Sequence, residues 1–254
     1  PDLFVNDKPI KIIEATKYLG DIINSKNTND DMLKEREGKA IGKIISIFAT
    51  INDVTLGAFQ LEALILMYHS FFIPTIIFNC QAWSNLTTKD INKLSNIQMK
   101  YLKRMMKVPQ STPNCFIYLE TGILPLEHEI NKRQLTFLQH ILSLEVDDPV
   151  RLLYDQMKEL PYEKNWRNKM EETRRMYKIN LDDEGIKRLS AIAFKGLVKH
   201  HIRVYVFTYL MNERLTKVKV QHLEYNNYRQ QDYLTELPPK LVYTMRRIRC
   251  SMRA

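Results

Sequence analysis

The chain has 254 residues, of which 44% are hydrophobic, so it can bury one or two cores, and this argues against a wholly disordered chain. Lysine and arginine outnumber aspartate and glutamate by 38 to 29, which favours a polyanionic partner, either nucleic acid or an anionic membrane surface. A basic protein without such a partner is the alternative that composition leaves open.

Short β-prone runs occupy the first 25 residues. They are Phe4-Val5, Pro9 to Ile13 and Tyr18 to Ile23, and the turn-prone Asn6-Asp7 and Gly20 separate them. We therefore predict a β-hairpin or three short strands at the N-terminus. The rest should be mainly α-helical, because only 7 glycines are present for tight turns.

A first helix is predicted from about residue 29 to residue 52. Its apolar residues recur with helical spacing, at Ile41, Ile44, Ile45 and Phe48. Arg36, Lys39 and Lys43 lie on the opposite side at about 100° per residue. We expect these three side chains to contact a polyanion.

A long apolar helix is predicted over about residues 58–72. Pro74 should end it, because proline lacks the amide donor and crowds the preceding turn. A second short helix then runs to Trp83. Polar residues and the proline interrupt the apolar run, so it predicts a buried helix pair and no membrane span.

The helix predicted over residues 89–106, with Thr87 and Asp90 as a capping box, is the most informative element. One of its faces collects only cations: Lys89, Lys93, Lys100, Arg104 and Lys107. Surface helices usually mix charges, because oppositely charged residues four positions apart stabilise them. We expect these cations to lack counter-charges within the protein, and a bound polyanion would relieve their repulsion.

Further helices are predicted to the C-terminus, the first with Thr112 as N-cap and Gly122 as C-terminal stop. From Lys195 onward the chain has twelve lysines and arginines against four acids, which accounts for eight of its nine net positive charges. Tyrosines lie among these cations, and they either stack on bases or pack in the protein interior. The candidate phosphate contacts in this region are Lys195, Lys199, Arg203, Arg246, Arg247 and Arg249.

Residues for catalysis or metal binding form no recognisable pattern. The acidic pairs Asp30-Asp31, Asp147-Asp148 and Asp182-Asp183 are better explained as helix N-caps than as metal ligands. The three cysteines are far apart and form no CxxC pair, which indicates a reducing intracellular compartment, nuclear or cytoplasmic. We predict no catalytic residue, no metal site and no cofactor in this chain.

Several stretches, taken together, resemble one family. They are Tyr18-Leu19-Gly20, Ile73-Pro74, Cys80-Gln81-Ala82-Trp83, Leu94 through Gln98 to Arg104, Thr112-Pro113, and Thr121-Gly122-Ile123-Leu124-Pro125-Leu126 with Arg133. Their order and spacing resemble the region after the catalytic palm in reverse transcriptases of non-LTR (LINE-type) retrotransposons, over about residues 18–144.

The resemblance implies a primer-grip hairpin, then a thumb and a connecting region that leads to a zinc knuckle and an endonuclease. Lys17 and Tyr18 would lie near the primer terminus. The catalytic aspartates, with their Mg²⁺, would precede residue 1, and the zinc knuckle would follow residue 254. The chain does not begin with methionine, which fits a piece of a longer protein.

The predicted organisation has four parts. Residues 1–25 form the β-hairpin remnant of a polymerase palm, and residues 26–110 form a helical thumb-like domain. Residues 111–180 form a helical connector, and residues 181–254 form a basic helical C-terminal region.

These features together predict binding of an RNA or RNA–DNA duplex through its phosphates, without catalysis by the chain alone. Two alternatives stay open. One is a helical protein-interaction scaffold from a decayed or domesticated element. The other is a complete enzyme of a kind that the sequence does not reveal.

Overall fold

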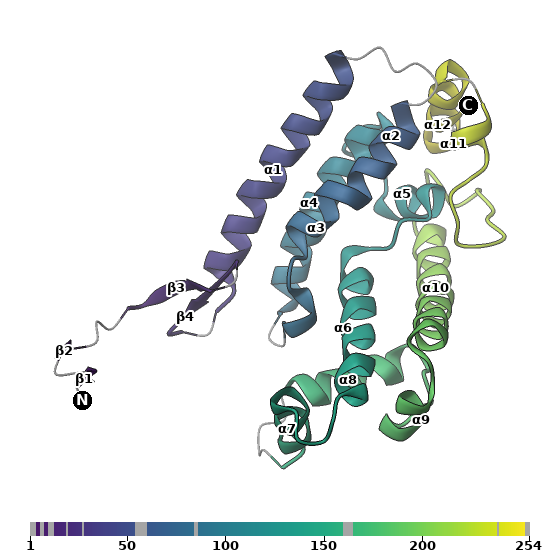
Figure 1. Ribbon diagram of the computed structural model, residues 1–254. Helices are drawn as coiled ribbons and strands as arrows, with labels where there is room; N and C mark the ends of the chain where they lie inside the picture. The colour runs from purple at the N-terminus through teal and green to yellow at the C-terminus, as the bar shows by residue number, and fades with distance from the viewer. Residues whose placement is uncertain are drawn as a thin grey trace.

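The computed structural model describes residues 4–5, 8–9, 13–18, 20–26, 28–53, 60–83, 86–159, 165–237 and 239–251. The fold class is as predicted: N-terminal β-hairpins precede a multi-helix arrangement (Figure 1). The antiparallel pairs are β1 (Phe4–Val5) with β2 (Lys8–Pro9) and β3 (Ala15–Tyr18) with β4 (Asp21–Asn24).

Helices α1 (Asp30–Asp53), α2 (Gln60–Met67), α3 (Ile73–Ile76) and α4 (Thr88–Met106) pack together after the hairpin. The chain ascends along α1, descends through α2 and α3, and ascends again along α4 (Figure 1). Helices α1 and α4 are therefore parallel neighbours. A 3-10 turn, Cys80–Ala82, lies between α3 and α4.

Pro74 does not end the second helical segment, which corrects the prediction. A π-helical turn, Tyr68–Phe72, joins α2 to α3, and Pro74 lies in the first turn of α3. Pro74 therefore lies within a continuous helical run, and the Ile73 amide before it still donates to the Tyr68 carbonyl across the π-helical turn. The wider π-helical turn also gives the proline ring room.

Eight helices follow within the described residues, and α6 and α10 are the longest of them. Helix α6 packs on the 3-10 turn and on α8, α9 and α10. The eight helices are α5 (Asn114–Thr121), α6 (Leu126–Ser143), α7 (Pro149–Gln156), α8 (Trp166–Met176), α9 (Asp183–Arg188), α10 (Ala191–Leu215), α11 (Tyr233–Glu236) and α12 (Pro239–Ser251).

Side-chain caps and a left-handed glycine set several helix ends at the predicted positions. Asp148 and Asp182 accept hydrogen bonds from backbone amides and cap α7 and α9, as predicted. Gly122 ends α5 in the left-handed conformation, also as predicted. Thr112 does not cap α5, because that helix begins one residue later, after Pro113, without a side-chain cap.

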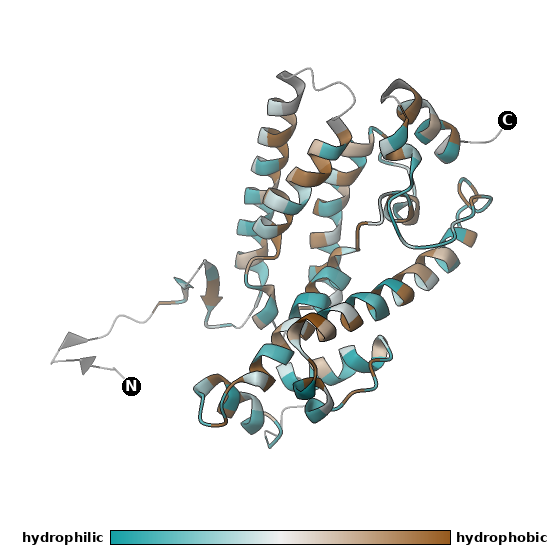
Figure 2. Ribbon diagram, turned by 45° about the vertical axis from the view of Figure 1, so that its right-hand side comes forward, coloured by the Kyte–Doolittle hydropathy of each residue, from teal (hydrophilic) through white to brown (hydrophobic). Residues whose placement is uncertain are grey.

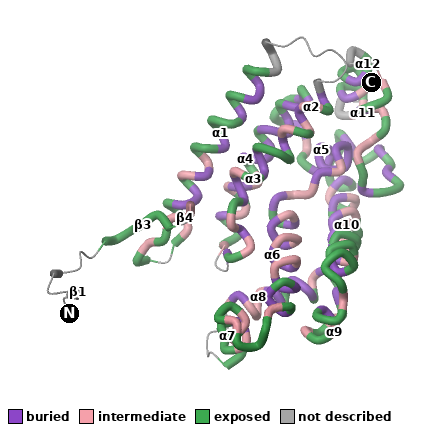
Figure 3. The backbone as a smooth tube through the Cα atoms, viewed as in Figure 1, coloured by how far each residue is buried: buried purple, intermediate pink, exposed green. Residues whose placement is uncertain are grey.

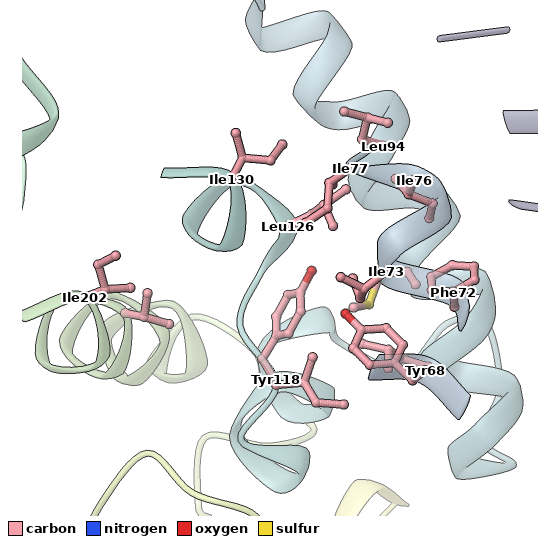
Figure 4. Packing of buried hydrophobic residues seen from close by; sticks show 14 of the residues in the cluster. Tyr68, Phe72, Ile73, Ile76, Ile77, Leu94, Tyr118, Leu126, Ile130 and Ile202 are labelled. Carbon is pink, nitrogen blue, oxygen red and sulfur yellow. The ribbon is translucent and has the colours of Figure 1, made fainter. Parts of the chain in front are cut away.

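A continuous apolar core joins these helices, and Figure 3 shows buried residues where helices face one another. Buried Gln98 of α4 lies inside this core and uses all of its hydrogen-bonding capacity. Its amide donates to the Tyr68 hydroxyl and the Leu124 carbonyl, and its oxygen accepts from the Tyr118 hydroxyl and the Leu126 amide. Figure 4 shows both tyrosines beside Leu126. Gln98 therefore fixes α4 relative to the segments before and after it.

Hydrophobic and hydrophilic residues alternate along the helices (Figure 2), as expected for helices with one buried face. None of the described helices combines the length and the apolar composition that crossing a bilayer requires.

Candidate nucleic-acid interface

A polar cleft of about 470 Å³ lies along the cationic face of α4. Residues three or four positions apart on a helix share a face, so several α4 side chains reach the cleft together. The lining residues are Glu37 from α1, Lys93, Asn96, Met99, Lys100 and Lys103 from α4, and Gln110 and Asn114 from the segment after it. The structure thus brings two predicted contacts, Lys93 and Lys100, into one site.

The start of α4 is held by the predicted capping box. The Thr87 hydroxyl accepts from the Asp90 amide, and the Asp90 carboxylate accepts from the Thr87 amide and hydroxyl. Asn29, directly before α1, donates to the same carboxylate at 3.3 Å. This cluster fixes the beginning of α4 beside the beginning of α1, and it sets which residues face each other along the cleft.

The expectation that the α4 cations have no counter-charges within the protein is wrong for two of them. Lys93 Nζ lies 3.0 Å from Asp30, and Lys100 Nζ lies 4.0 Å from Glu37. Both acids belong to α1, which runs parallel to α4, so residues seven apart on one helix meet residues seven apart on the other. The pattern of α4 alone could not reveal acids that a different helix contributes.

Lys103 lies in the same cleft and was not among the predicted contacts. Its side chain is buried, its ammonium donates to the Gln110 carbonyl at 2.7 Å, and burial lowers its pKa. A signal was present in the sequence, because Lys103 follows Lys100 by three positions and shares its face.

The other cations of the α4 face differ in their surroundings. Lys89 is exposed, and no carboxylate among the described residues lies within ion-pair distance of it. The Arg104 guanidinium lies 4.5 Å from the centre of the Phe48 ring. Lys107 ends α4 in the left-handed conformation, and its side chain is exposed.

Arg36 is buried, which corrects the expectation that it faces outward with Lys39 and Lys43. Its guanidinium pairs with Asp21 and donates to the Gly20 carbonyl at 3.0 Å. The Asn79 amide donates to the second oxygen of Asp21 at 2.7 Å. The hairpin folds back over this side of α1, so a residue opposite the apolar stripe becomes enclosed.

Lys17 of the hairpin and Lys39 of α1 share one acid, Glu35. Their ammonium groups lie 2.5 and 2.6 Å from its carboxylate, and hydrogen bonds from them lower the pKa of Glu35 to about 2. Tyr18 remains 63% exposed, and Lys43 is exposed with no ion pair among the described residues. These side chains form a polar surface next to the hairpin.

Three arginines predicted as C-terminal phosphate contacts donate instead into the protein. Buried Arg246 donates to the carbonyl of Met106 at 2.6 Å, at the end of α4. Arg249 pairs with buried Glu120 at 2.8 Å, and Arg203 donates to the Tyr228 carbonyl at 2.7 Å. Their surroundings are therefore those of structural cations.

The remaining predicted cations of this region stay on the surface. Lys195 and Lys199 of α10 are exposed, and neither has an ion pair among the described residues. Arg247 is exposed and lies 5.8 Å from the centre of the Tyr243 ring.

Two tyrosines of the C-terminal region are interior residues. Tyr225 and Tyr228 are buried, and their hydroxyls donate to Glu120 and to the Ile123 carbonyl. Tyr243 remains 40% exposed. Tyr225 and Tyr228 are therefore packing residues of the protein interior and do not stack on bases.

No group of three or more histidine, cysteine or acidic side chains suited to a metal ion occurs within the described ranges. Asp183, from one of the acidic pairs, instead bridges Arg167 and Arg174 at 3.0 Å each. No family model, curated protein or solved structure matches this chain.

Proposed function

We propose that the α4 face binds the phosphate backbone of an RNA or RNA–DNA duplex, and that the chain is the duplex-holding part of a retrotransposon reverse transcriptase. One observation carries the proposal. Lys93 and Lys100 reach one open polar cleft, which buried Lys103 also lines and whose lining contains a single acid, Glu37. Three polar amide side chains and Met99 complete the lining, and amides also donate to phosphate oxygens.

The ion pairs of Lys93 and Lys100 with acids of α1 are compatible with this role. Asp30 is 71% exposed and Glu37 is 46% exposed, and such surface pairs contribute only about 0–1 kcal/mol. Phosphate can replace these carboxylates, because neutralising a nucleic-acid backbone also releases its condensed counterions. Lys89 to Lys107 spans about 27 Å along the helix, which is long enough to follow several successive phosphates.

The test is the salt dependence of binding to a labelled RNA–DNA duplex, measured by fluorescence anisotropy. The triple variant Lys89→Gln, Lys93→Gln, Lys100→Gln removes three cations from the face. We expect the log–log salt slope to flatten by about 2 to 3 units, since each phosphate contact contributes about 0.9.

The matched control is Lys187→Gln, Lys217→Gln, Lys219→Gln, which changes the net charge equally at exposed lysines away from the cleft. It should change the slope much less. Equal slopes for the two triple variants would mean that overall charge, and not this face, binds the duplex.

A protein-interaction scaffold is the second candidate, and an exposed apolar stripe on α7 and the turn before it favours that function. Val146, Val150 and Leu153 are spaced by four and three residues and are 68%, 46% and 54% exposed. If the chain acts as a scaffold, the α4 triple variant should leave binding of its protein partner unchanged.

A further inference from the structure

A second cleft of about 470 Å³ lies between α6, α10 and the 3-10 turn, away from the α4 face. Three cations and two aromatic rings reach it, with one acid. Its lining residues are Gln81, Glu129, Lys132, Arg133, Thr136, Phe137, His140 and Lys195. No function assigned above uses this cleft.

The acid of the cleft orients the neighbouring cations. Glu129 lies 2.5 Å from Lys132 Nζ and 3.4 Å from Arg133 Nε. Its side chain is 17% exposed, whereas those of Lys132 and Arg133 are 27% and 39% exposed. The carboxylate therefore lies beneath the two cations and holds both on the cleft surface.

Lys195 brings a third cation from a different helix. Helices α6 and α10 pack side by side and antiparallel, with His128 of α6 beside Tyr205 of α10 and Gln139 bonded to the Leu189 carbonyl just before α10. The first turns of α10 thus lie beside the C-terminal half of α6. Lys195 is exposed there, and no described carboxylate pairs with it. The Lys195 ammonium is therefore available to an anionic group of a ligand.

The aromatic part of the cleft consists of Phe137 and His140. Phe137 is half-buried, and its ring makes an edge-to-face contact with Trp166 at 6.0 Å between ring centres. This contact holds the Phe137 ring in place. The His140 ring is exposed and lies 6.0 Å from Phe137 at an interplanar angle of 34°. The two rings offer π-faces beside the cations.

We propose that this cleft binds single-stranded nucleic acid. Lys132, Arg133 and Lys195 bind successive phosphates, and an unpaired base stacks on His140 and Phe137. Cations that follow a backbone beside aromatic rings are the usual means of binding single strands, whatever their sequence. The two rings distinguish this site from one for a duplex, because the bases of a duplex are already stacked on one another and offer no free face to the rings.

The test measures binding of the whole chain to labelled single strands, ten thymidines or ten uridines long, and to an abasic strand of the same charge. Arg133→Gln combined with Lys195→Gln should weaken oligothymidine binding about tenfold. It should also flatten the salt slope by about 1.4 units, since each single-strand contact contributes about 0.7. The double variant should weaken oligouridine binding to the same extent, because the proposed contacts are to phosphate and base and not to the sugar.

His140→Ala tests the stacking step separately. It should weaken oligothymidine binding about fivefold and leave binding of the abasic strand unchanged, since stacking needs a base. Equal losses on both strands would overturn the assignment of the base to this ring.

Two controls separate this inference from the duplex proposal. Lys217→Gln combined with Lys219→Gln removes two exposed lysines outside the cleft, and single-strand affinity equal to that of the Arg133 and Lys195 double variant would overturn the site. The α4 triple variant should retain single-strand binding even if it loses duplex binding. Either proposal can therefore fail without the other.

Discussion

Arg36 and Lys39 lie three residues apart on α1 and share a helix side, yet their surroundings are opposite. The side chain of Arg36 is 5% exposed and pairs with Asp21, whereas that of Lys39 is 44% exposed and pairs with Glu35 at the surface. A buried ion pair is lost at a large cost when one partner is removed, because the other charge stays buried. A surface pair contributes little.

These two residues give the first prediction on stability. Arg36→Ala should lower the free energy of unfolding by about 3 kcal/mol, because Asp21 loses its charge partner in a poorly hydrated position. Lys39→Ala, the matched control, should change it by less than about 0.5 kcal/mol. Urea unfolding measures both. Similar midpoints for the two variants would mean that Arg36 is not a structural cation.

Individual helices show how closely local chemistry decides where an element begins and ends. Thr87 and Asp90 begin α4, and Gly122 ends α5, at the places that the sequence indicates. Gly122 has a φ of +63°, where side chains other than glycine are strained. A Cβ at this position would also lie 2.5 Å from the backbone of Arg229 and Gln230.

Gly122→Ala tests this role of local chemistry at a helix end. It should destabilise the protein by at least about 2 kcal/mol, because left-handed strain adds to a clash with backbone that cannot move aside. Gly42→Ala is the control: Gly42 is within α1, and nothing lies within 4 Å of an added Cβ. That variant should stabilise by roughly 0.5–1 kcal/mol. Thermal unfolding should separate the two, and destabilisation by both would contradict the argument.

At the scale of the whole molecule, α12 contacts the end of α4 and α5, which lie more than 100 residues earlier in the chain. Arg246 donates to carbonyls at the C-terminus of α4, where a cation also complements the helix dipole. Arg249 pairs with fully buried Glu120 of α5, and its guanidinium lies 5.5 Å from the ring centres of both Tyr225 and Tyr233. These contacts join Arg246 and Arg249 to the interior of the protein.

Arg249→Met should therefore cost about 3 kcal/mol of stability, because Glu120 would keep a buried charge without its cation. Adding Glu120→Gln should recover part of that loss, since it removes the orphaned charge. Arg247→Gln, two residues away and exposed, should cost less than about 1 kcal/mol. Guanidinium unfolding of the three variants is the measurement. A double variant less stable than Arg249→Met would refute the coupling.

The sequence by itself determined the helical fold class, most helix limits and the cationic face of α4. Those features depend on side chains within about one helical turn of each other, through capping and periodicity. Lys93, Asn96, Lys100 and Lys103 share a face wherever α4 packs.

Only the tertiary structure decided what each cation does. The acid that pairs with Lys93 lies 63 positions earlier, and the carbonyl that accepts from Arg246 lies 140 positions earlier. The cleft of α6 and α10 likewise needs residues from three separate segments. Ion pairing and burial depend on distance in space, and periodicity along one helix carries no information about which other segment packs against it.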